Sequence, residues 1–331
     1  MKPTPSAALV AIRDLSLSFP GKPAGTWFKA LDEVSLDIRP REILGLVGES
    51  GSGKTTLGKA ILRLHRPSSG SITIDGRDIA QLGERQLKPF RRDLQMIFQD
   101  PAASFNPRRT IGQALSQPLL TQRLARRAEL PERIETLLRR VGLPARFSSS
   151  FPHELSGGQL QRVAIARALA LAPALIVADE AVSKLDVSVR AGVLNLFKDI
   201  QAETGLSMLF ITHDLEVARF LCHRIGVLYH GRLVEIGPAA EVFSRPLHPY
   251  TKLLLGTLDA ADDDSGDIRR MQSVSNSGCR YLNTCPLAID LCRERRPELE
   301  ALRTGHLVAC HRAGEWAAPG AVPRRAEQTS A

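Results

Sequence analysis

The sequence lacks any long hydrophobic run. Its longest apolar stretch, residues 168–178, holds eleven residues and is interrupted by Pro173, whereas a helix that crosses a bilayer needs about 20. The apolar stretch near the N-terminus, residues 7–12, is too short for the core of a secretory signal. We therefore expect no membrane-spanning helix and a protein that stays in the cytoplasm, where cysteine thiols remain reduced.

Cysteine is scarce, which makes its placement informative. The 331 residues contain five cysteines, and four of them fall near the C-terminus with five, six and seventeen residues between them: Cys279, Cys285, Cys292 and Cys310. Disulfides are the least expected use of these thiols in a reducing compartment. Four thiolates suit a tetrahedral zinc ion or an iron–sulfur cluster, although the closely paired cysteines of common zinc ribbons are missing. Free structural thiols are the alternative.

The chain is basic, with 44 Lys and Arg against 35 Asp and Glu. Residues 259–278 have a negative net charge, with five aspartates and two arginines, and this composition predicts a linker. A basic body suits nucleic acid, an anionic membrane surface or phosphate ligands, and a solvated arginine-rich surface is the simpler interpretation. The length indicates about two domains.

Short apolar segments alternate with helical patterns along the chain. Strands are expected at residues 9–19, 29–38, 43–47, 71–74, 175–178, 207–212 and 225–229. A helix at residues 189–204 separates two of them, and residues 111–171 have a mostly helical pattern. This order predicts an α/β protein with a parallel sheet.

A glycine-rich segment lies between the strand expected at residues 43–47 and a predicted helix. It fits the phosphate-loop pattern in residue type and spacing. Its members are Gly48, Glu49, Ser50, Gly51, Ser52, Gly53, Lys54, Thr55 and Thr56. The glycines let backbone N–H groups face phosphates at a helix N-terminus. Lys54 is expected to reach the β- and γ-phosphates, and the Thr55 hydroxyl to bind Mg²⁺.

Two carboxylates follow the apolar strand at residues 175–178. We expect Asp179 to hold Mg²⁺ and Glu180 to act as general base toward the attacking water. Gln99 and His213 follow two other predicted strands, from which they could reach a γ-phosphate or its water, and Gln99 is also a candidate Mg²⁺ ligand. Each of these residues alone would be an ordinary loop or cap residue, but together and in this order they indicate a nucleotide site.

A further segment opens a predicted helix whose N-terminus can bind phosphate. It consists of Ser156, Gly157, Gly158 and Gln159. With this segment in place, the order of motifs over roughly residues 8–258 resembles the ATP-binding subunits of ABC transporters. Residues 98–108, 151–154 and 248–251 and the cysteine-bearing tail resemble the dipeptide and oligopeptide importer branch of that family.

The resemblance implies a P-loop NTPase with a RecA-like core, an antiparallel β-subdomain and a helical subdomain. The ATPase domain would cover residues 1–258, with the helical subdomain at about 100–171 and a small cysteine-rich extension at 279–331. It also implies a head-to-tail dimer, in which each ATP lies between the phosphate loop of one subunit and residues 156–159 of the other. Asp186 is then a further nucleotide-site residue. Phe19 matches the aromatic that stacks on adenine, with Trp27 and Phe28 as alternatives.

The implied partners are a second ATP-binding subunit (identical or paralogous), two membrane permeases and an extracytoplasmic peptide-binding protein, with no nucleic acid. The chain would sit peripherally at the cytoplasmic face of the inner membrane. Residues 100–150 carry nine arginines against four acidic residues, and this excess would face the permeases and the anionic leaflet. For the four cysteines the resemblance favours a [4Fe–4S] cluster, with zinc as the alternative.

Two departures from the family pattern lie after the carboxylate pair. Ala181 stands where proline is common, and Lys184 where a small residue is common. Neither removes a phosphate, metal or water ligand, so we expect an active ATPase that drives peptide uptake. Nickel or another small solute is the alternative cargo. A soluble ABC ATPase acting on nucleic acid or ribosomes, and a catalytically silent regulatory module, are the alternatives from other classes.

Overall fold

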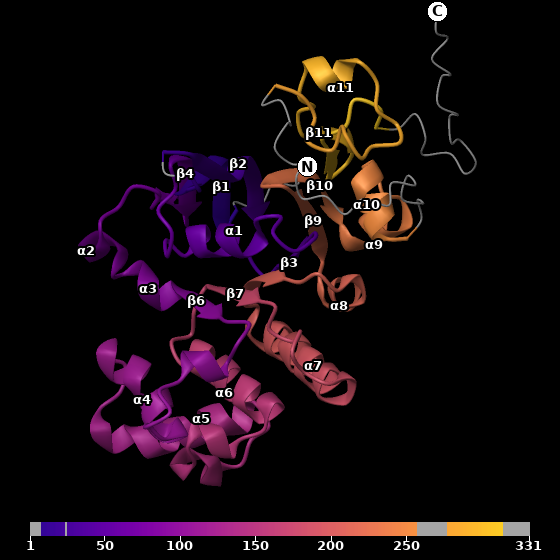
Figure 1. Cartoon of the computed structure of the whole chain (residues 1–331). Coiled ribbons are helices and arrows are strands. Elements are labelled where there is room, and N and C mark those ends of the chain that lie inside the picture. The colour runs from indigo at the N-terminus through magenta and orange to yellow at the C-terminus, as the bar shows by residue number, and fades with distance from the viewer. Residues whose placement is uncertain (1–7, 24, 257–276, 314–331) are drawn as a thin grey trace, which may run out of the picture.

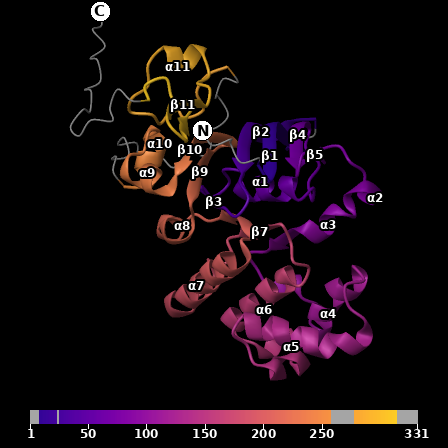
Figure 2. The ribbon, with the colours of Figure 1, turned by 180° about the vertical axis from the view of Figure 1, so that it is seen from behind.

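The structure is a computed structural model that describes residues 8–23, 25–256 and 277–313. The linker expected at residues 259–278 lies outside the described residues except for its last two positions. Figure 1 shows a helical lobe at one end, two sheets in the middle and the C-terminal segment at the opposite end. The view from behind in Figure 2 has the same arrangement.

The first sheet is antiparallel and has the strand order β2-β1-β4-β5. Its strands are β1 (Val10–Pro20), β2 (Trp27–Ile38), β4 (Ser69–Ile74) and β5 (Arg77–Asp78). Strand β1 pairs with β2 from Val10 opposite Ile38 to Pro20 opposite Trp27. Leu15, Leu17 and other apolar side chains of this sheet are buried against α1 and the second sheet.

The second sheet has eight strands in the order β11-β12-β10-β9-β3-β8-β7-β6. The strands are β3 (Ile43–Val47), β6 (Leu94–Ile97), β7 (Leu175–Asp179), β8 (Ser207–Ile211), β9 (Arg224–Tyr229), β10 (Arg232–Pro238), β11 (Glu300–Arg303) and β12 (His306–Val308). The five strands from β9 to β6 are parallel, so their carboxyl ends share one edge. Every residue of β3, β7 and β8 is buried, as expected for parallel strands covered on both faces.

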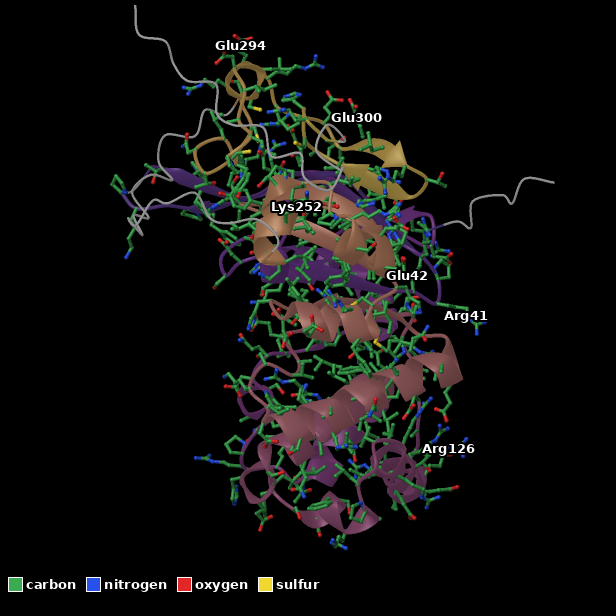
Figure 3. The ribbon with its side chains drawn as sticks, turned by 90° about the vertical axis from the view of Figure 1, so that its right-hand side faces the viewer. Arg41, Glu42, Arg126, Lys252, Glu294 and Glu300 are labelled. Atoms are coloured by element: carbon green, nitrogen blue, oxygen red, sulfur yellow. The ribbon has the colours of Figure 1, made fainter. Side chains whose placement is uncertain are left out.

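Helices cover the second sheet and form the separate lobe. The helices are α1 (Lys54–Ile61), α2 (Glu84–Leu87), α3 (Phe90–Asp93), α4 (Ile111–Thr121), α5 (Leu130–Arg140), α6 (Gly157–Leu169), α7 (Val187–Thr204), α8 (Leu215–Leu221), α9 (Ala239–Ser244), α10 (Pro249–Leu254) and α11 (Leu291–Glu294). Short 3₁₀ turns are η1 (Ala102–Ser104), η2 (Arg127–Glu129), η3 (Ala145–Ser149) and η4 (Pro152–Glu154). Helices α4, α5 and α6 make up the lobe in Figure 1. Arg126 lies at that end of the molecule, far from Glu294 and Glu300 (Figure 3).

These features confirm the expected α/β class with a parallel sheet, a separate antiparallel sheet and a helical subdomain. Strand β10 and the strands of the C-terminal segment were not expected from the sequence. Strand β12 pairs with β10, so this segment continues the main sheet and is more than an appendage. In the described part of the chain, no helix is both long and apolar enough to cross a membrane.

Candidate functional site

The phosphate loop links buried strand β3 to helix α1. Gly48 has φ of 145°, and a Cβ on it would lie 2.2 Å from the Leu228 carbonyl oxygen. Gly53, the N-cap of α1, has φ of 104°, and a Cβ there would lie 2.7 Å from the Ala30 carbonyl oxygen. Side chains are excluded at both positions, which explains the glycines of the motif.

Lys54 closes the loop on itself. Lys54 is 5 % exposed, and its ammonium donates to the carbonyl oxygens of Gly48 and Glu49 at 2.7 and 2.6 Å. Burial lowers the pKa of Lys54, while the charges of Glu180, Asp179 and Glu49 oppose this shift. The ammonium therefore lies buried in the loop and close to the acidic groups of the site, as expected for a group that meets a phosphate.

Thr55 and Asp179 meet beside the loop. The Thr55 hydroxyl donates to Asp179 Oδ1 at 2.8 Å, and Asp179, at the end of β7, is 5 % exposed. Burial raises the pKa of Asp179, and the charge of Glu180 adds to the rise, although the Thr55 hydrogen bond opposes it. A buried carboxylate next to a hydroxyl oxygen is a donor set that fits Mg²⁺.

Glu180 brings two other predicted residues to the same edge of the sheet. Gln99 Nε2 donates to Glu180 Oε2 at 2.6 Å, and His213 Nδ1 lies 3.2 Å from Glu180 Oε1. Gln99 follows β6 and His213 follows β8, so all three side chains come from the carboxyl ends of adjacent parallel strands. Glu180 has φ of 45°, a backbone conformation that is uncommon outside glycine.

The segment at residues 156–159 lies at the start of α6. Ser156 is the N-cap: its Oγ accepts from the Gln159 N–H at 3.3 Å, and Gln159 Oε1 accepts from the Ser156 N–H at 3.0 Å. Asp186 caps α7 in the same way by accepting from Val189 N–H at 3.0 Å. Among the described residues, none of these three side chains is hydrogen-bonded to the phosphate loop. Within one chain they are therefore a second group of candidate nucleotide-site residues, separate from the group around the phosphate loop.

The candidate adenine-stacking residue packs within its own subdomain. The Phe19 ring meets the His65 ring edge-on, with centroids 5.3 Å apart. Phe28 stands opposite Phe19 in the β1–β2 pair, and Trp27 precedes it. Trp27 and Phe28 are 70 % and 60 % exposed. All three rings belong to the same hairpin. The preference for Phe19 over Trp27 and Phe28 as the residue that stacks on adenine stays a prediction.

Two further contacts near the site were not expected from the sequence, although residues 248–251 and Lys184 were noted there. Tyr250 Oη accepts a hydrogen bond from the Glu49 N–H of the phosphate loop at 2.9 Å. Lys184 Nζ bonds Asp100 Oδ2 at 2.9 Å and so joins the loops that carry Glu180 and Gln99. Each pair lies far apart in sequence, so no local pattern could have found it.

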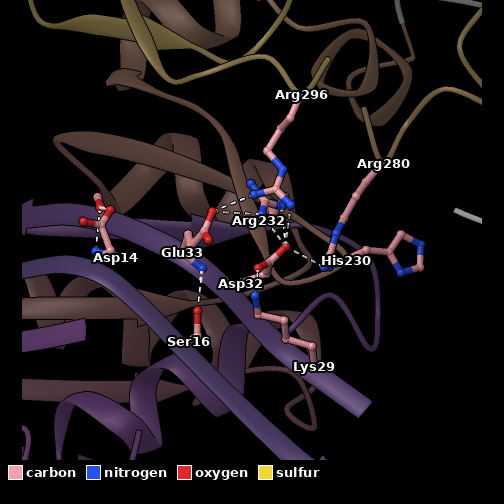
Figure 4. A network of polar contacts seen from close by, with 10 residues as sticks. Asp14, Ser16, Lys29, Asp32, Glu33, His230, Arg232, Arg280 and Arg296 are labelled. Carbon is pink, nitrogen blue, oxygen red and sulfur yellow. Dashed lines mark hydrogen bonds and ion pairs between the residues drawn. The ribbon is translucent and has the colours of Figure 1, made fainter. Parts of the chain in front are cut away.

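Buried Asp32 is the centre of a network between β2, β10 and the C-terminal segment (Figure 4). Asp32 Oδ2 accepts from Arg232 Nε at 2.6 Å and from Arg280 at 2.7 Å. Lys29 forms an ion pair with the other oxygen, and Arg296 lies 3.5 Å from Oδ2. Two of the four cations come from the C-terminal segment, so ion pairs connect this segment to β2.

The four clustered cysteines are free thiols in this structure. Burial raises the pKa of Cys285 to about 11 and that of Cys310 to about 12, and the neighbouring cysteines add to both rises. The expected metal site does not follow from this placement, because the described residues hold no group of three or more His, Cys, Asp or Glu side chains that could bind a metal ion. Cys222, the fifth, is buried in the main core.

Residues 31–183 match the profile of the ABC transporter family, and residues 234–292 match the C-terminal region of oligopeptide/dipeptide transporters. A putative peptide import ATP-binding protein of Brucella ovis is 46 % identical over 92 % of this chain and 98 % of its own length. The oligopeptide transport ATP-binding protein AppF of Bacillus subtilis is 44 % identical, covering 86 % of this chain and 89 % of its own. A dimeric ATP-binding cassette with bound ADP and Pi superposes with a TM-score of 0.64 at 32 % identity, over 70 % of this chain and 98 % of its own.

Proposed function

This chain belongs to the ABC transporter family, as an ATP-binding subunit of the oligopeptide and dipeptide importer type, and from that premise we propose that it hydrolyses ATP to drive peptide uptake. The observation that carries the proposal is the convergence of Gln99, Glu180 and His213 beside the phosphate loop. The relatives named as peptide import or oligopeptide transport proteins support peptide as the cargo.

The residues divide the hydrolysis step between them. Glu180 accepts the proton of the water that attacks the γ-phosphorus, while Gln99 and His213 orient that water and the carboxylate. Lys54 leaves the loop carbonyls and meets the charge that develops on the phosphate oxygens as the bond to ADP breaks. Thr55, Asp179 and Gln99 would hold Mg²⁺, which when bound neutralises phosphate charge.

The second set of residues supports a composite site between two subunits. Ser156, Gly157, Gly158, Gln159 and Asp186 have no bond to the phosphate loop of their own chain among the described residues, which fits a role toward the loop of a second copy or a paralogue. The solved relative with ADP and Pi is itself a dimer. The remaining proposed partners are two permeases and an extracytoplasmic binding protein, and they place the chain peripherally at the inner face of the membrane.

The domain boundaries also stay proposals. We assign residues 1–258 to the ATPase domain, with the helical subdomain at about 100–171, and residues 279–331 to the extension. Pairing of β10 with β12 indicates that the extension is built onto the ATPase domain by the main sheet.

The [4Fe–4S] cluster, with zinc as its alternative, is supported by one observation only. The Cys279 N–H donates to the Cys292 carbonyl oxygen at 2.8 Å, so two of the four cysteines are neighbours in the fold. Because the described residues offer no ready metal-binding group, we derive no chemistry from it. Anaerobic purification followed by iron, sulfide and zinc analysis decides between them. Iron with sulfide supports the cluster, and one zinc per chain supports a zinc site. If neither metal is found, the thiols are free.

The catalytic assignment is tested by Glu180→Gln in the chain assembled with its permeases. ATP binding should be retained, because Lys54 and the loop are unchanged, while hydrolysis should fall at least about 100-fold because the general base is lost. The matched control is Glu84→Gln, since Glu84 is 83 % exposed and pairs only with Arg91 among the contacts described. Equal hydrolysis by wild type and Glu180→Gln would refute the assignment. Stimulation by peptides or by Ni²⁺ with the binding protein present identifies the cargo.

A further inference from the structure

Three tyrosines from distant parts of the chain pack together behind the phosphate loop. Tyr229 ends β9, Tyr250 lies in α10 and Tyr281 lies in the C-terminal segment. The ring centroids are 4.5 Å apart for Tyr229 and Tyr250, 5.6 Å for Tyr250 and Tyr281, and 5.2 Å for Tyr229 and Tyr281. Tyr250 is fully buried. Ring contacts at these distances restrict where its hydroxyl can lie.

That hydroxyl reaches the phosphate loop. Tyr250 Oη accepts the Glu49 N–H at 2.9 Å, and the Glu49 carbonyl accepts from Lys54 Nζ at 2.6 Å. One residue of the loop is thus bonded on one side to the tyrosine cluster and on the other to the lysine that meets phosphate. The position of Tyr250 therefore bears directly on the shape of the loop.

The turn before α10 is fixed by the C-terminal segment. Glu235 of β10 is fully buried and accepts from the N–H groups of Leu247 and His248, each at 2.8 Å. The third polar partner of the Glu235 carboxylate is His306 Nε2 of β12, which lies 2.7 Å from Oε1. His248 Nδ1 in turn accepts the Tyr250 N–H at 3.0 Å. The chain of contacts runs from β12 through Glu235 to the start of the helix that presents Tyr250.

Arg280, the residue before Tyr281, provides a second connection to the loop. It donates to the His230 carbonyl and to Asp32 Oδ2 (Figure 4). The next residue, Gly231, donates its N–H to the Ser52 carbonyl at 2.7 Å, and its own carbonyl accepts from Asp32 N–H at 2.9 Å. The C-terminal segment is therefore connected to the loop at two places. It reaches Glu49 through the tyrosine rings and Ser52 through the β9–β10 turn.

We propose that Tyr250 is a positioning residue for the phosphate loop and that the C-terminal segment, residues 277–313, sets its position. The inference rests on the proposed function, because it concerns how that site receives ATP. Tyr250 does not touch the phosphates; it holds the Glu49 amide so that the loop is shaped before ATP arrives. A loop ordered in advance binds its ligand with less loss of conformational freedom.

The first test is Tyr250→Phe in the full chain, with ATP as the probe. The variant keeps the ring and leaves the Glu49 N–H without its partner, so the Kd for ATP and the KM should rise about fivefold or more. The kcat at saturating ATP should stay within about twofold, because the groups around Glu180 are intact. Ser244→Ala is the control, since it removes an exposed hydroxyl that bonds the Ala240 carbonyl within α9, outside the tyrosine cluster. Its Kd should equal that of wild type.

The second test asks whether the C-terminal segment contributes. Arg280→Gln should raise the Kd for ATP, whereas Arg303→Gln should not, because the ion pair described for Arg303 is with Glu241 of α9 at 3.7 Å, away from the loop. Unchanged Kd in folded Tyr250→Phe, or equal effects of the two arginine variants, would overturn the proposal. Failure of wild type itself to bind ATP would instead overturn the proposed function.

Discussion

Asp32 is a buried carboxylate whose ionisation depends on residues from three parts of the chain. Burial alone would raise the pKa of Asp32, but hydrogen bonds from Lys29 and Arg232 and the charges of Arg232 and Arg280 outweigh it and lower the pKa below its ordinary 3.8. Removing the cations from a buried carboxylate leaves an unpaired buried charge, which lowers the stability of the fold. Removing the carboxylate does the same to its buried cations.

We expect Asp32→Asn to lower the free energy of unfolding at pH 7 by about 3 kcal/mol, because three arginines lose their shared counter-ion. Since the folded-state pKa of Asp32 lies below the unfolded value, its stabilisation is present above about pH 4 and is lost as the pH falls through the folded-state value. The difference between variant and wild type should therefore shrink in acid. Urea denaturation at pH 7 and pH 3 measures it.

The control for this prediction is Asp37→Asn. Asp37 pairs with Arg13 at 2.6 Å, with both side chains 40 % exposed or more. An exposed pair of this kind contributes about 1 kcal/mol or less. If Asp32→Asn were no more destabilising than Asp37→Asn, the buried network would not stabilise the fold as described.

At the scale of elements, the loops after β6 and β7 are joined twice. Gln99 bonds Glu180 at 2.6 Å, and the adjacent Asp100 bonds Lys184 at 2.9 Å. The bond to Lys184, together with a backbone bond from Ala103, lowers the pKa of Asp100. Lys184 was noted in the sequence as a departure from the family pattern, and the structure shows the contact that it makes within its own chain.

We expect Lys184→Glu to reduce the ATPase rate about threefold at low salt, because like charges then push the loops of Gln99 and Glu180 apart. Adding Asp100→Lys should restore the rate by recreating the pair with reversed charges. At about 0.5 M salt the single variant should approach wild type, because exposed charges are screened. Lys88→Glu, which changes the same charge at an exposed position, is the control. A double variant no better than the single would rule out the ion pair as the cause.

What the sequence could predict depended on how local each feature is. The phosphate loop needs glycine and lysine within nine neighbouring residues, and Gln99, Glu180 and His213 each follow a strand with a recognisable apolar pattern. The contact between Tyr250 and Glu49 spans 201 positions, and that between Arg280 and Asp32 spans 248. Spacing along the chain has no information on such pairs, because tertiary packing alone brings them together. Strands β11 and β12 escaped prediction because each has only a few residues.

At the scale of the whole molecule, the C-terminal segment is built into the ATPase body at three places. Strand β12 pairs with β10 through Glu235 opposite Val308 and Ile236 opposite Leu307. His306 meets buried Glu235, and the arginines of the segment meet Asp32. The segment lies opposite the helical lobe (Figure 1). It therefore acts on the ATP site from the side away from that lobe.

A chain ended after residue 276 should unfold at a midpoint lower by about 5 °C or more, because Glu235 and Asp32 lose buried partners. It should also bind ATP more weakly, because Tyr250 loses its support. Thermal denaturation and ATP titration measure both effects. His311→Ala in the full chain is the control: among the hydrogen bonds described, its half-buried ring contacts only the Arg295 carbonyl, at 2.8 Å. A shortened chain with wild-type midpoint and Kd would contradict this.

The charge network around Asp32 also sets an order of events during synthesis. Asp32 and Glu33 leave the ribosome early, whereas Arg280 follows 248 residues later and Arg296 follows Glu33 by 263. At roughly 5 to 20 residues per second, the first sheet waits about 10 to 50 s for these two arginines. Its final packing is therefore delayed until translation has nearly passed the whole described chain. Throughout that interval Lys29, and later Arg232, pair with the acidic residues of the sheet, while the two arginines of the C-terminal segment are still missing.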